Sequence, residues 1–134
     1  MRVAAKITNR QSGKAFETSL LLNTGYEAPG PRILLPQRLA EELGIGPGGV
    51  RVEAKTSVGI GALTDPGLRV TVEAEGKRVA EADVRVSGAE TEAIANDVLI
   101  ELLGIEIVRP GEGLYRFYDD PMHTTRKSVP PKTW

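Results

Sequence analysis

The side chains with the clearest capacity for chemistry directly follow three leucines, in the stretch "LLLNTGY" at residues 20–26. Asn23 and Thr24 supply an amide and a hydroxyl, which can donate and accept several hydrogen bonds. Gly25 lets another backbone approach closely, because glycine has no side chain. Asn and Gly also favour ordinary turns, so the triplet alone is typical of a turn. Whether it is also a functional loop must be judged from the surrounding sequence.

Other reactive residue types are scarce. The chain has no cysteine, which excludes disulfides and thiolate metal sites. Its one histidine, His123, lies in a polar segment, so a histidine-rich zinc site is impossible and a Ser-His-Asp triad would have to use that residue. The G-x-G-x-x-G pattern at residues 44–49 follows a helix signal and precedes a strand-like run, whereas dinucleotide binding needs the opposite order. We therefore expect neither a metal nor a cofactor.

The composition is typical of a soluble globular domain. The 134 residues are 40% hydrophobic and 26% charged, which suits one domain with a modest core. The net charge of -1 gives no basic field for nucleic acid or an anionic membrane, and no apolar run approaches the roughly 18 residues of a membrane span. We expect a soluble, cytoplasmic protein. The scarcity of Asn, Gln, Met and Cys fits either a thermophilic source or GC-rich codon usage.

The elements that must position the triplet are mainly strands. Apolar and β-branched runs predict them within residues 2–9, 13–23, 33–35, 49–61, 63–88, 105–108 and 113–118. Two short helices are predicted at residues 36–44 and 97–103, each closed by a glycine. Residues 119–134 carry three prolines and many polar groups, which indicates a tail that follows the surface or is disordered.

A short pattern occurs twice, at an offset of 60 residues. Leu39-x-Glu41-x-Leu43-Gly44-Ile45 returns as Leu99-x-Glu101-x-Leu103-Gly104-Ile105. Each copy reads as a short helix that ends at a glycine and leads into a new strand. The repeat predicts two related halves, each with a set of strands and one helix.

Together these motifs resemble the retropepsin-like aspartic proteases, the single-domain relatives of pepsin. The matching segments are "LLNTG" at residues 21–25, "LPQRLAEELG" at 35–44 and "IANDVL" at 94–99, followed by Leu103-Gly104. The resemblance covers residues 1–118 and is most specific between 20 and 45. It implies an all-β fold, a closed barrel of antiparallel strands with two short helices, in a domain at 1–118 followed by the polar, Pro-rich tail at 119–134.

The resemblance also implies a site. Its catalytic motif falls on Asn23, Thr24 and Gly25, with Asn23 at the position of the catalytic aspartate. A flap hairpin that covers substrate would fall on residues 57–62. The substrate-binding residues implied in this way are Tyr26, Gly59, Ile60 and Gly61.

The chain departs from the family pattern at two positions. Peptide hydrolysis by this mechanism needs two carboxylates that share one proton, whereas Asn23 offers a neutral amide without useful basicity near pH 7. The family's second-half glycine is replaced by Ala95, or by Asn96 if the helix is aligned from its C-terminal end. Either Asn23 replaced Asp deliberately, to trap a bound state or prevent self-cleavage, or the chain is a natural relative that lost the chemistry. The change at Ala95 favours the natural origin.

The expected function follows from the resemblance and from these departures. A single-domain chain carries one triplet, so a site with two such side chains requires a twofold homodimer. Thr24 would then hydrogen-bond across the dimer, and extended peptides would bind under the flaps by strand-to-strand hydrogen bonds. We expect an aspartic endopeptidase family member that is catalytically impaired, with itself and a peptide or protein as partners. The alternatives are a non-catalytic peptide-binding or dimerisation module with the same fold, and a small β-barrel unrelated to proteases.

Overall fold

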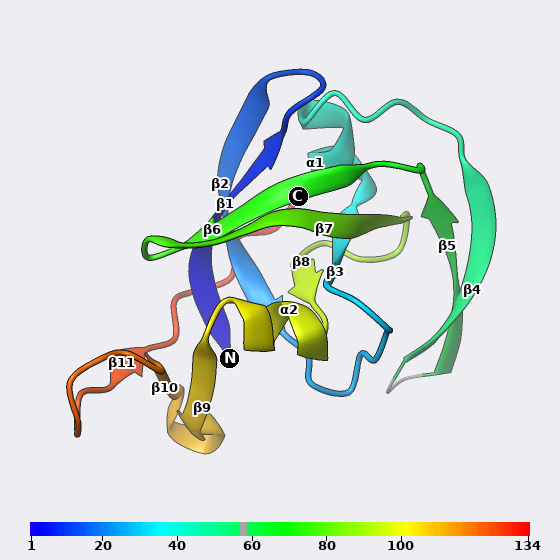
Figure 1. The fold of residues 1–134 in the computed structure, drawn as a ribbon. Helices are drawn as coiled ribbons and strands as arrows, with labels where there is room; N and C mark the ends of the chain where they lie inside the picture. Colours follow the sequence, from blue (N-terminus) through cyan, green and yellow to red (C-terminus); the bar gives the residue numbers. More distant parts are fainter. Residues whose placement is uncertain (57–58) are drawn as a thin grey trace.

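The chain folds mainly into β-strands, with two helices of six residues each. This computed structural model describes residues 1–56 and 59–134, and side chains outside 54–61. The elements in chain order (Figure 1) are β1 (Arg2–Asn9), β2 (Lys14–Leu22), β3 (Arg32–Pro36), α1 (Gln37–Glu42), β4 (Val50–Thr56), β5 (Gly59–Asp65), β6 (Arg69–Ala74), β7 (Lys77–Ser87), β8 (Ala93–Ala95), α2 (Asp97–Leu102), β9 (Ile105–Arg109), the 3-10 turn η1 (Pro110–Glu112), β10 (Leu114–Phe117) and β11 (Arg126–Lys127).

Six strands close into a barrel. They follow the order β3-β8-β2-β1-β6-β7, and β7 pairs back onto β3 to close the ring. Neighbouring strands are antiparallel except for two parallel pairs, β2 with β8 and β3 with β7. The predicted closed all-β barrel with two short helices is therefore confirmed, whereas the expectation of antiparallel strands throughout is corrected, because two of the six neighbouring pairs are parallel.

The core lies inside the barrel and follows the alternation of its strands. In β1, Val3, Ala5 and Ile7 point inward and are at most 6% exposed, while the residues between them are more exposed. The register places Val3 opposite Leu20, which is fully buried, so the two strands contribute one apolar face. Burial of each large aliphatic side chain contributes roughly 1.5–3 kcal/mol to stability. Phe117 belongs to the same core cluster.

The two helices end as the repeated pattern predicts. Their apolar positions, Leu39 and Leu43 in one copy and Leu99 and Leu103 in the other, are all 0% exposed. Gly44 and Gly104 follow the last turns with φ angles of 75° and 74°, a conformation that L side chains rarely adopt.

The internal repeat extends from the helices to the strands. The β1–β2 pair Thr8–Ala15 corresponds to the β6–β7 pair Val72–Val79, in which each residue number is 64 higher. The parallel pair Leu20–Ala93 corresponds to Val84–Ile33, with an offset of 64 from β2 to β7 and of 60 from β3 to β8. Two halves related by an approximate twofold axis therefore build the barrel, as the repeat predicts. In this correspondence the counterpart of Asn23 is Ser87.

A hairpin extends from the barrel beside β7. Strands β4 and β5 pair from Val50–Asp65 to Thr56–Gly59, and the pair Thr64–Val86 attaches them to β7. The residues expected to form the flap begin at Ser57 and Val58, which lie outside the described residues. A separate three-stranded sheet of β9, β10 and β11 follows α2.

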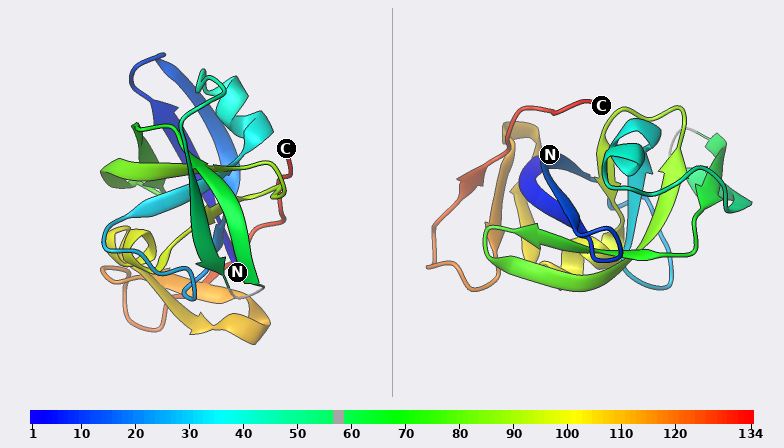
Figure 2. Two further views of the ribbon diagram at one scale, coloured as in Figure 1. Left: turned by 90° about the vertical axis from the view of Figure 1, so that its right-hand side faces the viewer. Right: turned by 90° about the horizontal axis from the view of Figure 1, so that it is seen from above.

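The C-terminal tail runs along the outside of the barrel, past the N-terminus (Figure 2). Its backbone N–H groups at Val129 and Lys132 donate to the Arg2 carbonyl at 2.9 Å and to the Ser19 hydroxyl at 2.7 Å. The Trp134 indole N–H donates to the Thr18 hydroxyl at 2.9 Å. These bonds tie residues 129–134 to β1 and β2.

Candidate functional site

The Asn23-Thr24-Gly25 triplet begins where the parallel pair of β2 and β8 ends. Leu22 and Ala95 form the last pair of that ladder, and the Asn23 N–H donates to the Ala95 carbonyl at 3.1 Å. The Tyr26 N–H then donates to the Asn23 carbonyl at 3.1 Å, which closes the turn. Because β8 lies deep in the barrel, the first residue of the triplet has a fixed position.

The side chains of the triplet are accessible. Asn23 is half-buried, whereas Thr24 and Gly25 are exposed. The Asn23 side-chain oxygen accepts the Gly25 N–H at 3.0 Å, so the amide stabilises its own turn. A carboxylate at position 23 could accept the same bond. The Asn23 amide nitrogen has no hydrogen-bond partner within the described part of the chain.

Asn96 supports this loop from beneath. It is 0% exposed, and its side-chain oxygen accepts the N–H groups of Leu99 at 3.0 Å and of Arg32 at 2.9 Å. Its amide nitrogen donates to the Gly30 carbonyl at 2.9 Å. One buried side chain thus caps α2 and holds the segment before β3, which satisfies three polar groups that would otherwise lack partners.

Ala95 and Asn96 occupy different places relative to the triplet. Ala95 is the residue that pairs with Leu22 and accepts the Asn23 N–H, and it is 0% exposed. Asn96 is instead the residue before α2 and serves as its cap. The position beneath the triplet is therefore that of Ala95. Sequence reasoning missed the central role of Asn96, although an Asn directly before a helix start is a recognisable capping signal.

Tyr26 lies beneath the hairpin rather than at the open surface. Its ring is 4% exposed, and its carbonyl accepts the Asp97 N–H at 3.1 Å, which ties the loop to α2. It belongs to a second apolar cluster, separate from the barrel core, whose other members are Leu34, Ile94 and Leu63, with Leu21 and Val52 packed against it. Strands β4 and β5 contribute Val52 and Leu63, so the hairpin covers the outer face on which the Tyr26 ring lies.

Two arginines that sequence reasoning did not single out lie beside Tyr26. Burial raises the pKa of the Tyr26 hydroxyl, while the nearby positive charges of Arg32 and Arg85, and the close approach of the Arg32 side chain to the hydroxyl, oppose that rise. The Tyr26 hydroxyl and the Arg32 Nε are both buried and have no hydrogen-bond partner among the residues that the structure describes. The only signal in the sequence was that Arg32 directly precedes the apolar run at 33–35. Its proximity to Arg85 depends on the pairing of β3 with β7, which the sequence does not reveal.

The remaining residues that the sequence assigned to substrate lie in β5. Gly59, Ile60 and Gly61 pair with Thr56, Lys55 and Ala54 across the hairpin. Their side chains belong to the range 54–61 that the structure does not describe. The hairpin and the triplet loop are joined through this second apolar cluster, since Leu63 and Val52 pack beside Tyr26.

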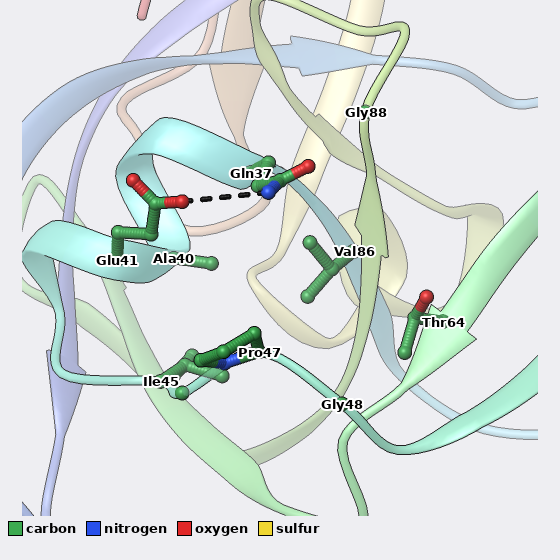
Figure 3. A pocket seen from close by; sticks show the side chains of 10 residues that line it. Gln37, Ala40, Glu41, Ile45, Pro47, Gly48, Thr64, Val86 and Gly88 are labelled. Carbon is green, nitrogen blue, oxygen red and sulfur yellow. Dashed lines mark hydrogen bonds between the residues drawn. The ribbon is translucent and has the colours of Figure 1, made fainter.

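A small cavity of about 120 Å³ lies between α1, the segment that follows it, and strands β5 and β7 (Figure 3). Side chains of α1, including Ala40 and Glu41, face Val86 and Thr64 across it, and Ile45 and Pro47 line the floor. None of its lining residues belongs to residues 23–26, so this cavity is distinct from the candidate site.

Comparison with known proteins gives no assignment: no family model matches the sequence, and no curated protein is similar to it. Among the described residues, no helix is long and apolar enough to cross a membrane. Within the same residues, no group of three or more His, Asp or Glu side chains could hold a metal ion.

Proposed function

We propose that this chain is a retropepsin-like member of the aspartic peptidases that binds extended peptides as a homodimer and is catalytically impaired by Asn23. One observation carries the proposal. The accessible Asn-Thr-Gly loop is fixed at the end of a central parallel strand pair, in a barrel whose two halves repeat the same strand-and-helix unit.

The internal repeat is the reason to propose two chains. Ser87, the counterpart of Asn23 in the second half, carries neither an amide nor a carboxylate and is 3% exposed. A single chain therefore offers one side chain of the required kind. A site with two facing Asn23 side chains needs a second copy, and a twofold axis through the exposed Thr24 and Gly25 would provide it.

The chemistry of such a site depends on position 23. Two carboxylates held close together share a proton, so that one activates water while the other protonates the scissile carbonyl. Two amides keep the hydrogen bonds to the Gly25 N–H but cannot take a proton from water. The chain is therefore proposed to hold peptides without cleaving them efficiently.

Peptide binding would take place beneath the β4–β5 hairpin. This hairpin already covers Tyr26, the residue that follows the triplet, through Val52 and Leu63. An extended peptide adds backbone hydrogen bonds to exposed strand or loop groups, and side-chain pockets set its specificity.

The alternative from another class is a non-catalytic peptide-binding or dimerisation module with this fold. The variant Asn23→Asp separates the two when it is incubated with a mixed peptide pool, with Asn23→Ser as the matched control that lacks a carboxylate. The protease proposal predicts cleavage by Asn23→Asp alone, and inhibition of that cleavage by pepstatin.

The other outcomes are equally informative. A folded dimer of Asn23→Asp that cleaves nothing would support the module. A monomer in sedimentation at all accessible concentrations would contradict the homodimeric peptidase and the dimerisation module, and a monomer that also binds no peptide would favour an unrelated β-barrel.

A further inference from the structure

A cationic group beside the candidate site includes polar atoms whose role in the fold is not explained by their contacts. It consists of Arg32 at the start of β3, Arg85 on β7 and the Tyr26 hydroxyl, and we name it the Tyr26 cluster. The Tyr26 hydroxyl and the Arg32 Nε are buried without a hydrogen-bond partner in the described part of the chain. Buried donors without acceptors are rare in folded proteins, because each loses its bonds to water.

The carboxylates nearest in the sheet are engaged elsewhere. The β3–β7 register sets Arg32 beside Asp83, but Asp83 accepts a hydrogen bond from the Arg69 Nε at 3.1 Å. Arg85 lies 3.4 Å from an oxygen of Asp65, and one of its nitrogens also donates to the Val84 carbonyl at 2.9 Å. Arg32 has no carboxylate within ion-pair distance among the described residues. The cluster therefore holds two guanidinium groups, of which Arg85 is paired with the neighbouring Asp65.

The surroundings of the cluster suit part of a peptide side chain. The Tyr26 ring packs with Leu34 and Ile94, which provide apolar contacts for methylene groups. Arg32 is a partly exposed residue whereas the Tyr26 hydroxyl is buried, so an approaching carboxylate would meet the Arg32 side chain first. The hydrogen bond from the Tyr26 N–H to the Asn23 carbonyl sets the cluster directly beside the triplet.

We propose that the Tyr26 cluster is a carboxylate-recognition pocket, which selects peptides with an Asp or Glu side chain next to the segment held at Asn23. The carboxylate would accept hydrogen bonds from the Arg32 guanidinium and the Tyr26 hydroxyl, while Arg85 adds positive charge. This inference rests on the proposed function, because it names the class of peptide that the same site prefers. It adds a specificity that the resemblance does not imply.

The test compares peptides that differ by one group. Peptides from a library selected on the unaltered chain are synthesised with Glu or with its neutral isostere Gln at each acidic position, and their dissociation constants are measured by calorimetry. We expect the acidic form to bind at least about tenfold more tightly, the range typical of charge-assisted hydrogen bonds. Arg32→Gln should abolish this preference, and Tyr26→Phe, which removes only the hydroxyl, should reduce it. Arg38→Gln on the exposed face of α1 removes the same charge elsewhere and should retain the preference.

The possible failures can be told apart. Equal affinity for acidic and neutral peptides, or a preference that survives Arg32→Gln, would overturn the pocket and leave peptide binding intact. If no peptide binds, the proposed function fails, and a titration with sodium acetate against sodium chloride then tests the anion site alone. A shift of the Arg32 Nε–H resonance with acetate only would assign the site to small carboxylates, and no shift would overturn the anion site as well.

Discussion

The Asn23 N–H donates to the carbonyl oxygen of Ala95 at 3.1 Å, which links residues 72 positions apart in the sequence. This bond continues the parallel ladder of β2 and β8 by one step beyond Leu22. It joins the candidate site to the strand that leads into α2, whose first turn is capped by Asn96. The position of the triplet therefore depends on buried polar groups as well as on its own turn.

Asn96→Ala should destabilise the protein substantially. The substitution leaves the N–H groups of Arg32 and Leu99 and the carbonyl of Gly30 without their partner at a site that is 0% exposed. We expect a loss of about 2–4 kcal/mol in the free energy of unfolding, measured with urea. Gln11→Ala, on the exposed β1–β2 turn, serves as the control and should change stability by less than about 0.5 kcal/mol. A loss for Asn96→Ala as small as the control's would contradict the supporting role of Asn96.

Gly104→Ala should cost more than the same change at Gly13. Both glycines have a φ of 74°, but a Cβ at Gly13 would meet nothing within 4 Å, whereas one at Gly104 would lie 2.5 Å from the Tyr118 ring. Gly13→Ala should lose about 1 kcal/mol from backbone strain alone, and Gly104→Ala at least about 1 kcal/mol more. Thermal unfolding of both variants measures the difference. Equal losses would show that the Tyr118 contact is unimportant.

Trp134→Ala should release the C-terminal tail. The indole donates to Thr18 and packs edge-to-face on Phe16 at a centroid distance of 6.0 Å. We expect a loss of about 1–3 kcal/mol, since the ring is only partly buried. Met122→Ala, at a side chain that is 82% exposed, is the control and should be close to neutral.

Trp134 is also the only tryptophan, so its fluorescence reports on the tail directly. Emission already at the wavelength of free indole in the native protein would contradict the packed arrangement.

Stability should fall on acidification in part through Asp120. The hydrogen bond from Arg126 and that from the Phe117 N–H hold the pKa of this carboxyl well below its usual range. A lowered folded-state pKa stabilises the fold above the unfolded pKa, near 4, and this contribution is lost progressively as the pH falls below it.

Asp120→Asn should accordingly lower the melting temperature at pH 7 and weaken its dependence on pH below about 4. Glu90→Gln, at an exposed residue, is the control. Parallel pH profiles for Asp120→Asn and the unaltered chain would contradict the assignment.

Local signals in the sequence predicted the ends of the helices well. The signal for a helix end, leucines at helical spacing followed by Gly44 or Gly104, involves only residues that are neighbours in the sequence. The observed α2 ends one residue before the predicted end. Pro36 was expected in the first helical turn, but it ends β3 and precedes α1 with a ψ of 144°, because the fixed φ of proline suits both positions. The end of β2 at the triplet was equally visible, since apolar residues give way abruptly to a turn.

The unpredicted features all depend on contacts between distant residues. The pairing of β3 with β7 sets Arg32 opposite Asp83 and two residues from Arg85, and no local pattern specifies that pairing. Trp134 donates to Thr18, which lies 116 positions earlier in the sequence. The composition of the tail could not distinguish this packed arrangement from a disordered tail. The site was therefore predictable as a loop, whereas its buried supports and cationic neighbours were not.

The central claim is that two Asn23 loops face each other across a twofold axis. The chain has no cysteine, so Thr24→Cys introduces a single thiol at an exposed position of the loop, and Gln11→Cys introduces one on the distant β1–β2 turn. Mild oxidation followed by non-reducing electrophoresis measures how fast each variant becomes a covalent dimer. The account predicts rapid, nearly complete cross-linking of Thr24→Cys and little for Gln11→Cys. Cross-linking of Thr24→Cys no faster than that of Gln11→Cys would contradict it.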